Sequence, residues 1–227
     1  MQYYVLIDVC TTVYGDPPEL RIVLLGRNGR EKSIVGNLLL GREVFDLNYV
    51  LHQTERARGL VDGRCFTVVN IPDLLDVPNE KYIKELQQCV TLSAPGPHVL
   101  LLVVTPEEFT ENERNRIRHI LDSMSAKSCD YSMVVLTAGR DMETCVDKHP
   151  QVHQLIEECR QRYLEIKLSV DQTNLISSID KIMSENRGGH LSCERCEEST
   201  GGATTEREAK AEERSSGKVR TWGGYGK

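Results

Sequence analysis

The chain has 227 residues, of which 39% are hydrophobic and 27% are charged, so its length suits one globular domain with some chain to spare. Its longest apolar run, His98 to Thr105, is far shorter than the roughly 18 to 20 residues that a membrane span needs, which excludes an integral membrane protein. The net charge of −6 argues against a general affinity for nucleic acid.

The first residues and the cysteines both bear on the compartment. Met1 to Cys10 has no basic region before its apolar residues, and Asp8 interrupts them, so the segment does not have the pattern of a secretory signal. Eight cysteines spread over a chain of this length favour reduced thiols. We therefore expect a cytoplasmic protein without structural disulfides.

Apolar runs of strand length alternate with amphipathic stretches of helical period. In chain order we expect a strand at 19–25, a helix at 34–40, a strand at 66–70, a helix at 79–89, a strand at 99–104, a helix after the capping box of Thr110 and Glu113, a strand at 131–136, a helix from near Pro150, a strand at 164–168 and a helix over 175–183. This alternation predicts an α/β fold with a mostly parallel sheet and helices on both faces.

Composition changes abruptly near Asn186. Residues 187–227 are mostly Gly, Ser, Thr, Glu, Arg and Lys, and cannot bury enough surface to offset chain entropy. We expect a leader at 1–18, one α/β domain at 19–186 and a disordered polar tail at 187–227. The leader either adds an edge strand or remains loose. In the tail, His190, Cys193 and Cys196 have the spacing of zinc ligands, although structural zinc normally takes four ligands, and a pair of exposed thiols is the simpler interpretation.

The first predicted strand runs into a glycine-containing loop with the spacing G-x-x-x-x-G-K-[ST], in which Glu31 replaces the second glycine. In such a loop, backbone N–H groups and a helix N-terminus cradle phosphates, while Lys32 would reach the β and γ oxygens and Ser33 would bind Mg²⁺. A structural turn without a ligand is the alternative. The candidate nucleotide-binding residues of the loop are Gly26, Arg27, Asn28, Gly29, Arg30, Lys32 and Ser33.

Glu31 counts against phosphate binding in two ways. If its position needs a left-handed backbone, a residue other than glycine costs roughly 1–2 kcal/mol. If its carboxylate lies within about 5 Å of a phosphate, repulsion at an effective dielectric near 20 is about 3 kcal/mol. A side chain turned into solvent would avoid most of the second cost.

Two separate motifs resemble one protein family. Leu20 to Gly29, Lys32-Ser33 and Gly36 to Gly41 are similar to the start of the immunity-associated GTPases, the GIMAP family with the avirulence-induced type of G domain. Gly96 to Val103, followed by Phe109 to Glu113, resembles the box that distinguishes that family from other GTPases. The resemblance implies a Ras-like P-loop GTPase domain that binds GTP or GDP with Mg²⁺, self-associates through its nucleotide face, and works on or near internal membranes of lymphoid cells.

The resemblance also assigns roles outside the loop. Thr54 would be the switch threonine that binds Mg²⁺ together with Ser33, with a solvated loop threonine as the alternative. Asp141, in Thr137 to Asp141, would accept hydrogen bonds from the guanine N1 and N2 donors. The family's Asp-Thr-Pro-Gly segment is replaced by Asn70 to Asp73, which removes the carboxylate that supports Mg²⁺ and places a negative charge where a glycine N–H meets the γ-phosphate.

These residues point to a guanine-nucleotide-binding protein of the GIMAP type. No Gln or Arg is placed to orient an attacking water, so no catalytic residue is assigned, and we expect at most a slow GTPase. The alternative is a nucleotide-free pseudo-GTPase that keeps the fold as a protein interaction or assembly module. A redox or metal sensor built on the tail cysteines is a third hypothesis.

Overall fold

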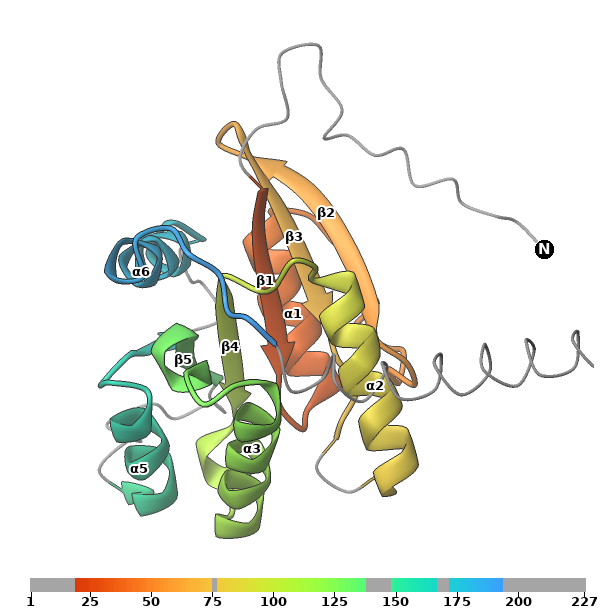
Figure 1. Cartoon of the computed structure of the whole chain (residues 1–227), viewed down its shortest axis with the longest axis vertical. Helices are drawn as coiled ribbons and strands as arrows, with labels where there is room; N and C mark the ends of the chain where they lie inside the picture. The colour runs from red at the N-terminus through yellow and green to blue at the C-terminus, as the bar shows by residue number, and fades with distance from the viewer. Residues whose placement is uncertain (1–18, 75–76, 138–147, 167–171, 194–227) are drawn as a thin grey trace, which may run out of the picture.

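The computed structural model describes residues 19–74, 77–137, 148–166 and 172–193. Its strands form one six-stranded sheet in the order β2-β3-β1-β4-β5-β6 (Figure 1). All neighbouring strands pair in parallel except β2 and β3, which are antiparallel. The strands are β1 (Glu19–Leu25), β2 (Glu55–Val61), β3 (Arg64–Asn70), β4 (Val99–Val104), β5 (Ser132–Thr137) and β6 (Tyr163–Ile166).

Helices cover both faces of the sheet, and each face has its own apolar core. On one face lie α1 (Gly29–Leu40) and α6 (Gln172–Glu185). The other face is covered by α2 (Asn79–Leu92), α3 (Glu111–Met124) and α5 (Pro150–Glu158). Every residue of β4 is buried, as a central strand covered on both sides requires. Two short 3-10 helices complete the described elements, η1 (Pro106–Glu108) and η2 (Ser128–Tyr131).

The predicted α/β fold is confirmed, and most element boundaries agree within a few residues. The capping box at α3 is present in both directions: Thr110 Oγ1 accepts from the Glu113 N–H, and the Glu113 carboxylate accepts from the Thr110 N–H at 2.7 Å. The largest difference is at α1, which begins at Gly29 and not at Ile34. Half of the glycine loop therefore belongs to the first turn of a helix.

The antiparallel edge strand β2 was not predicted. Its sequence, ERARGLV, is rich in arginine and contains a glycine, so it has little strand propensity. The signal for it lies in the turn, because Asp62 and Gly63 both have positive φ, of 49° and 75°, and an Asp-Gly pair is the typical two-residue link of a β-hairpin. The hairpin places an exposed strand next to the central parallel strands.

The predicted start of the polar tail is wrong by at least seven residues. Leu191 and Cys193 are buried in the core on the α2 and α3 side, and the Leu191 N–H donates to the Pro97 carbonyl at 2.8 Å. Gly96 has a φ of +149°, and a Cβ there would lie 2.0 Å from the Leu191 carbonyl oxygen. Average composition missed this segment because a single leucine in polar surroundings anchors it.

The thiols also differ from expectation. Cys65, the second residue of β3, is disulfide-bonded, whereas Cys89, Cys129, Cys159 and Cys193 carry reduced thiols. Spacing along the chain says nothing about which thiols the fold brings together, so the expectation of no structural disulfide was wrong.

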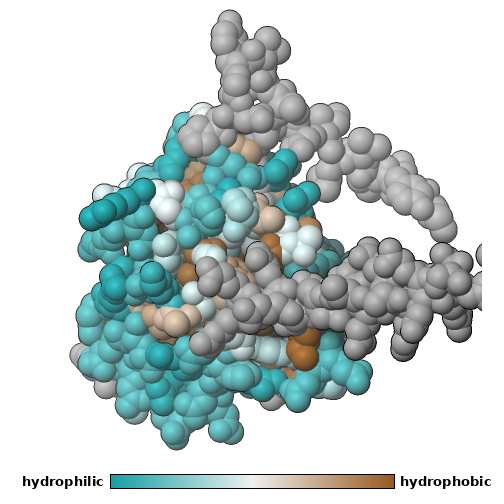
Figure 2. Space-filling model, in the orientation of Figure 1, coloured by the Kyte–Doolittle hydropathy of each residue, from teal (hydrophilic) through white to brown (hydrophobic). Residues whose placement is uncertain are grey.

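The described surface is mainly polar. Figure 2 shows hydrophilic side chains over most of the face that carries α3 and α5. Within the described ranges, no helix is both long and apolar enough to span a membrane. The large apolar side chains exposed there are Tyr49, Val50, Leu60, Ile83 and Tyr163.

Candidate functional site

The glycine loop lies where β1 ends and α1 begins. Gly26 has a φ of +145°, and a Cβ at this position would come within 2.2 Å of the Val103 carbonyl oxygen. Only glycine fits there, because β1 and the neighbouring β4 approach closely at this point. Gly29 is different: it is the first residue of α1, and its Cβ would meet no atom nearer than 4.0 Å.

The first turn of α1 is capped from within the loop. Asn28 is the N-cap, and its side-chain oxygen accepts from the Glu31 N–H at 3.2 Å, while its carbonyl accepts from the Lys32 N–H at 3.1 Å. Glu31 is helical, so the first of its two expected costs, a left-handed backbone, does not arise. Two N–H groups of this turn already have acceptors within the chain.

The two arginines of the loop reach outward to neighbouring segments. Arg27 forms an ion pair with Glu113 at 2.9 Å, which joins the loop to the capping box of α3. The Arg30 guanidinium donates to the Leu47 carbonyl at 3.5 Å. The sequence predicted the capping box but not that its carboxylate would also hold the loop.

Lys32 is fully buried beneath the loop. Its ammonium donates to the Gly26 carbonyl at 2.6 Å. Burial lowers the pKa of Lys32 to about 7, and the nearby negative charge of Asp73 opposes that shift. A buried amine with so low a pKa carries its positive charge only at a large cost in free energy, which an anion at the loop would offset.

Ser33 and Asn70 meet at the carboxyl end of β3. The Asn70 side-chain N–H donates to Ser33 Oγ at 3.4 Å, and both residues are buried. Among the described residues, Asn70 Oδ1 is a buried oxygen without a hydrogen-bond partner. Such an unsatisfied acceptor costs about 1–3 kcal/mol, which a bound donor or cation would offset.

Thr54 lies at the start of β2 and is held by α2. Its N–H and its hydroxyl both donate to Glu85 Oε2, each at 2.8 Å, and both residues are buried. The structure thus joins Thr54 to α2 and not to Ser33. Glu85 was missed, although the sequence carries a signal: it lies on the apolar stripe of α2 with Tyr82, Leu86 and Cys89.

Asp141, the candidate for guanine recognition, lies outside the described residues, as does the rest of its segment after Thr137. Thr137 ends β5, where its hydroxyl lies 3.3 Å from that of Thr105 and 3.4 Å from the Val104 carbonyl oxygen.

Because β1, β3, β4 and β5 are parallel, their carboxyl ends lie along one edge of the sheet. Doubly wound folds bind their ligands at this edge.

The sheet order, the helices on both faces and the buried lysine after a glycine loop define a Ras-like P-loop GTPase domain. The chain belongs to the AIG1 family, whose model matches residues 20–210.

Relatives and solved structures agree with this assignment. The chain is 29% identical over 156 residues to GTPase IMAP family member 8 of Homo sapiens, covering 64% of this chain and 24% of that protein. It is 36% identical over 132 residues to immune-associated nucleotide-binding protein 7 of Arabidopsis thaliana, covering 55% of this chain and 42% of the relative. The chain thus spans less than half the length of either relative.

The fold is also similar to that of Toc33 from Arabidopsis thaliana in its complex with GDP and Mg²⁺. The TM-score is 0.61 at 15% identity, over 77% of this chain and 88% of Toc33. At this identity the likeness concerns the fold.

Proposed function

We propose that this chain binds GTP or GDP together with Mg²⁺ and has weak or absent intrinsic GTP hydrolysis. The observation that carries the proposal is the fully buried Lys32 amine, whose pKa is lowered to about 7 at the start of a helix. Phosphate oxygens placed there would restore its charge and accept from the helix N-terminus. Membership of the AIG1 family and the names of its relatives support the same ligand.

The residues present fit such a ligand. Ser33 Oγ lies beside the Asn70 side-chain amide, whose Oδ1 is unpaired, and oxygen atoms are the ligand type that Mg²⁺ prefers. When bound, the cation would neutralise phosphate charge. Gly26 to Arg30, Lys32 and Ser33 would hold the phosphates, and Asp141 would select guanine. Thr54 joins Ser33 at the metal only if it first leaves Glu85.

A nucleotide-free interaction module is the second candidate, and specific contacts favour it. The Asn28 side chain occupies the Glu31 N–H, and the charge of Asp73 acts on Lys32 as a phosphate would. The chain would then keep the G-domain fold for its surface. Self-association through the nucleotide face is part of the first proposal. Dimerization is important for the GTPase activity of Toc33 and Toc159, which supports this part by analogy.

Calorimetric titration of the full chain with GTP, GDP and ATP, with and without Mg²⁺, separates the two functions. Guanine-dependent binding at micromolar concentrations or tighter supports the nucleotide switch, whereas no binding at millimolar nucleotide supports the interaction module. The repaired variant E31G/N70D is the matched comparison. If only the repaired chain binds, Glu31 and Asn70 have closed the natural site. Single-turnover hydrolysis by the chain that binds then tests the expected slow rate.

A further inference from the structure

Two thiols meet where η2 packs against the end of α5. Cys129 lies within η2, and Cys159 is the C-cap residue of α5. Both residues pack against the same apolar core, and a hydrogen-bond interaction with the Cys159 thiol as the donor is the largest influence on the pKa of Cys129. Both cysteines are free. Two neighbouring reduced thiols can be oxidised to a disulfide where the backbone brings their Cβ atoms to about 3.5–4.5 Å.

The two segments are held together on both sides of the pair. Arg162 donates to the carbonyl oxygens of Asp130 and Cys129, at 2.8 and 3.4 Å. Arg160 forms an ion pair with the Asp130 carboxylate at 2.6 Å. The chain that follows Cys159 therefore fixes the chain that surrounds Cys129, so the nearness of the two residues is built into the fold.

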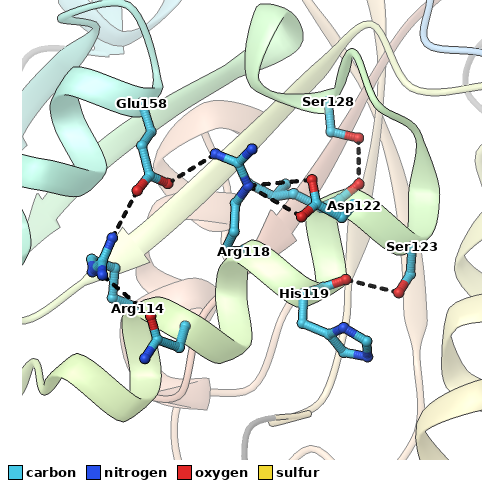
Figure 3. A network of polar contacts seen from close by, with 9 residues as sticks. Arg114, Arg118, His119, Asp122, Ser123, Ser128 and Glu158 are labelled. Atoms are coloured by element: carbon cyan, nitrogen blue, oxygen red, sulfur yellow. Dashed lines mark hydrogen bonds and ion pairs between the residues drawn. The ribbon is translucent and has the colours of Figure 1, made fainter.

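An anchored arginine faces the pair. Arg118 donates to Asp122 at 3.2 Å and to Glu158 at 3.3 Å, and Glu158 also accepts from Arg114 at 2.8 Å (Figure 3). The hydrogen bond from Cys159 lowers the pKa of Cys129 most, burial opposes it, and the charge of Arg118 lowers it further, to about 7. The carboxylates of Glu158 and Asp122 partly oppose Arg118. A thiol of this kind is a substantial fraction thiolate near neutral pH.

Accessibility gives the two thiols different roles. Cys129 is only partly buried, so part of this residue is open to a small molecule. Cys159 has no exposed surface, and the hydrogen bond to Cys129 together with burial raises its pKa. Cys129 therefore has the properties of an attacking thiol, and Cys159 those of a resolving thiol that reacts only with a neighbour.

We propose that Cys129 and Cys159 form a redox modification site that reacts with low-molecular-weight disulfides of the glutathione class. The Cys129 thiolate attacks one sulfur of the small disulfide, whose S–S bond breaks to leave a mixed disulfide on Cys129 and one small thiol. The Cys159 sulfur then loses its proton and attacks the Cys129 sulfur, which releases the second small thiol. Two protein thiols are oxidised to one disulfide, and one small disulfide is reduced to two thiols.

The test uses the full chain as purified, with the Cys65 bond intact, incubated with oxidised glutathione and then alkylated. Before alkylation we expect the intact mass to fall by two hydrogens, and peptide mapping of the alkylated chain should find Cys129 linked to Cys159. The Cys159→Ala variant should stop at one glutathione on Cys129. Cys129→Ala should give neither product, because it leaves Cys159 without access to the reagent.

Two further variants separate this proposal from general thiol reactivity. Cys89→Ala removes another buried, reduced thiol and should leave the reaction unchanged. Arg118→Gln should slow the modification of Cys129 several-fold, because the thiolate loses its cation. Glutathione found mainly on Cys193, or the same product from Cys129→Ala as from the unchanged chain, would overturn the proposal. So would the absence of a Cys129–Cys159 link in the unchanged chain.

Discussion

Nucleotide binding at the glycine loop should draw a proton from the buffer, because the amine that meets the phosphates is largely neutral beforehand. Burial lowers the pKa of Lys32 from an ordinary 10.5 to about 7. At pH 8 the free protein therefore carries the proton on only about one molecule in ten. Phosphate charge beside the amine favours its protonated form and moves the pKa back toward the ordinary value.

The expected uptake follows from these two states. Lys32 should take up about 0.9 proton at pH 8, about 0.5 at pH 7 and about 0.1 at pH 6, and protons released by the nucleotide phosphate reduce the net uptake at the two lower pH values. The terminal phosphate of a nucleotide has a pKa of about 6, so at pH 8 it is already ionised and adds almost nothing. Titration calorimetry in two buffers of different ionisation enthalpy measures the number of protons directly from the difference in heat.

Two variants show whether the proton is on Lys32. Lys32→Arg keeps a positive charge that does not titrate, so any binding that survives should show no uptake. Lys127→Met removes an exposed lysine far along the chain and should leave the uptake unchanged. Tight GDP binding at pH 8 with heats that do not depend on the buffer would contradict the expected proton uptake, because the Lys32 amine would then be charged before the ligand arrives.

The lowered pKa of Lys32 should also make the stability of the free protein depend on pH. Between pH 7 and 10.5 the unfolded chain holds a proton on Lys32 that the folded chain lacks, so the free energy of unfolding should rise with pH across this window. A pKa shift of this size changes the free energy of unfolding by up to about 5 kcal/mol across the window. In Lys32→Met this rise should be absent, which denaturant unfolding at several pH values measures.

Three further outcomes follow from the geometry. Gly26→Ala should destabilise the chain by about 2–6 kcal/mol, because backbone strain and a clash with a β4 carbonyl both contribute. Gly29→Ala in α1 should instead stabilise it by about 0.5–1 kcal/mol. Denaturant unfolding of both variants tests this difference, and equal effects would contradict it. Glu85→Ala should cost about 1–3 kcal/mol, because two buried Thr54 donors lose their acceptor, and an unchanged melting temperature would contradict the contact. Burial, then a neighbouring arginine, lower the pKa of His98 to about 4, so the unfolded chain binds more protons between pH 4 and 6.5. Stability should therefore fall as pH drops through this window, and thermal melts of His98→Gln should show a weaker fall.

The sequence predicted the parallel sheet well because buried strands and amphipathic helices leave strong local patterns. The six residues of β4 were predicted without error, and so was the cap of α3. The prediction missed β2 because this strand is stabilised by pairing with β3 and by the Asp62-Gly63 turn, while its own residues favour no strand. Anchoring of the tail at Leu191 also depends on contacts with distant residues, which composition does not record.

In the candidate site, too, only part of the arrangement could be predicted from local sequence patterns. The positions of Gly26, Lys32 and Ser33 could be predicted, because the loop has a fixed spacing between strand and helix. The partners of Arg27 and Thr54 could not, since Glu113 and Glu85 come from helices far along the chain. A carboxylate on an apolar helix face is the one local sign that such a partner exists.

The helical start of α1 by itself does not close the phosphate site. Nucleotide binding must release the Glu31 N–H from the Asn28 side chain, a neutral hydrogen bond worth about 0.5–1.5 kcal/mol. A hydrogen bond from the same N–H to a charged phosphate oxygen is worth about 1.5–3 kcal/mol, so this exchange favours the ligand. Repulsion from a Glu31 carboxylate held about 5 Å from the phosphate is about 3 kcal/mol and would cancel that gain. Whether this chain is a nucleotide switch or an interaction module therefore depends on where the Glu31 carboxylate lies when phosphate arrives, and much less on the cap that Asn28 provides.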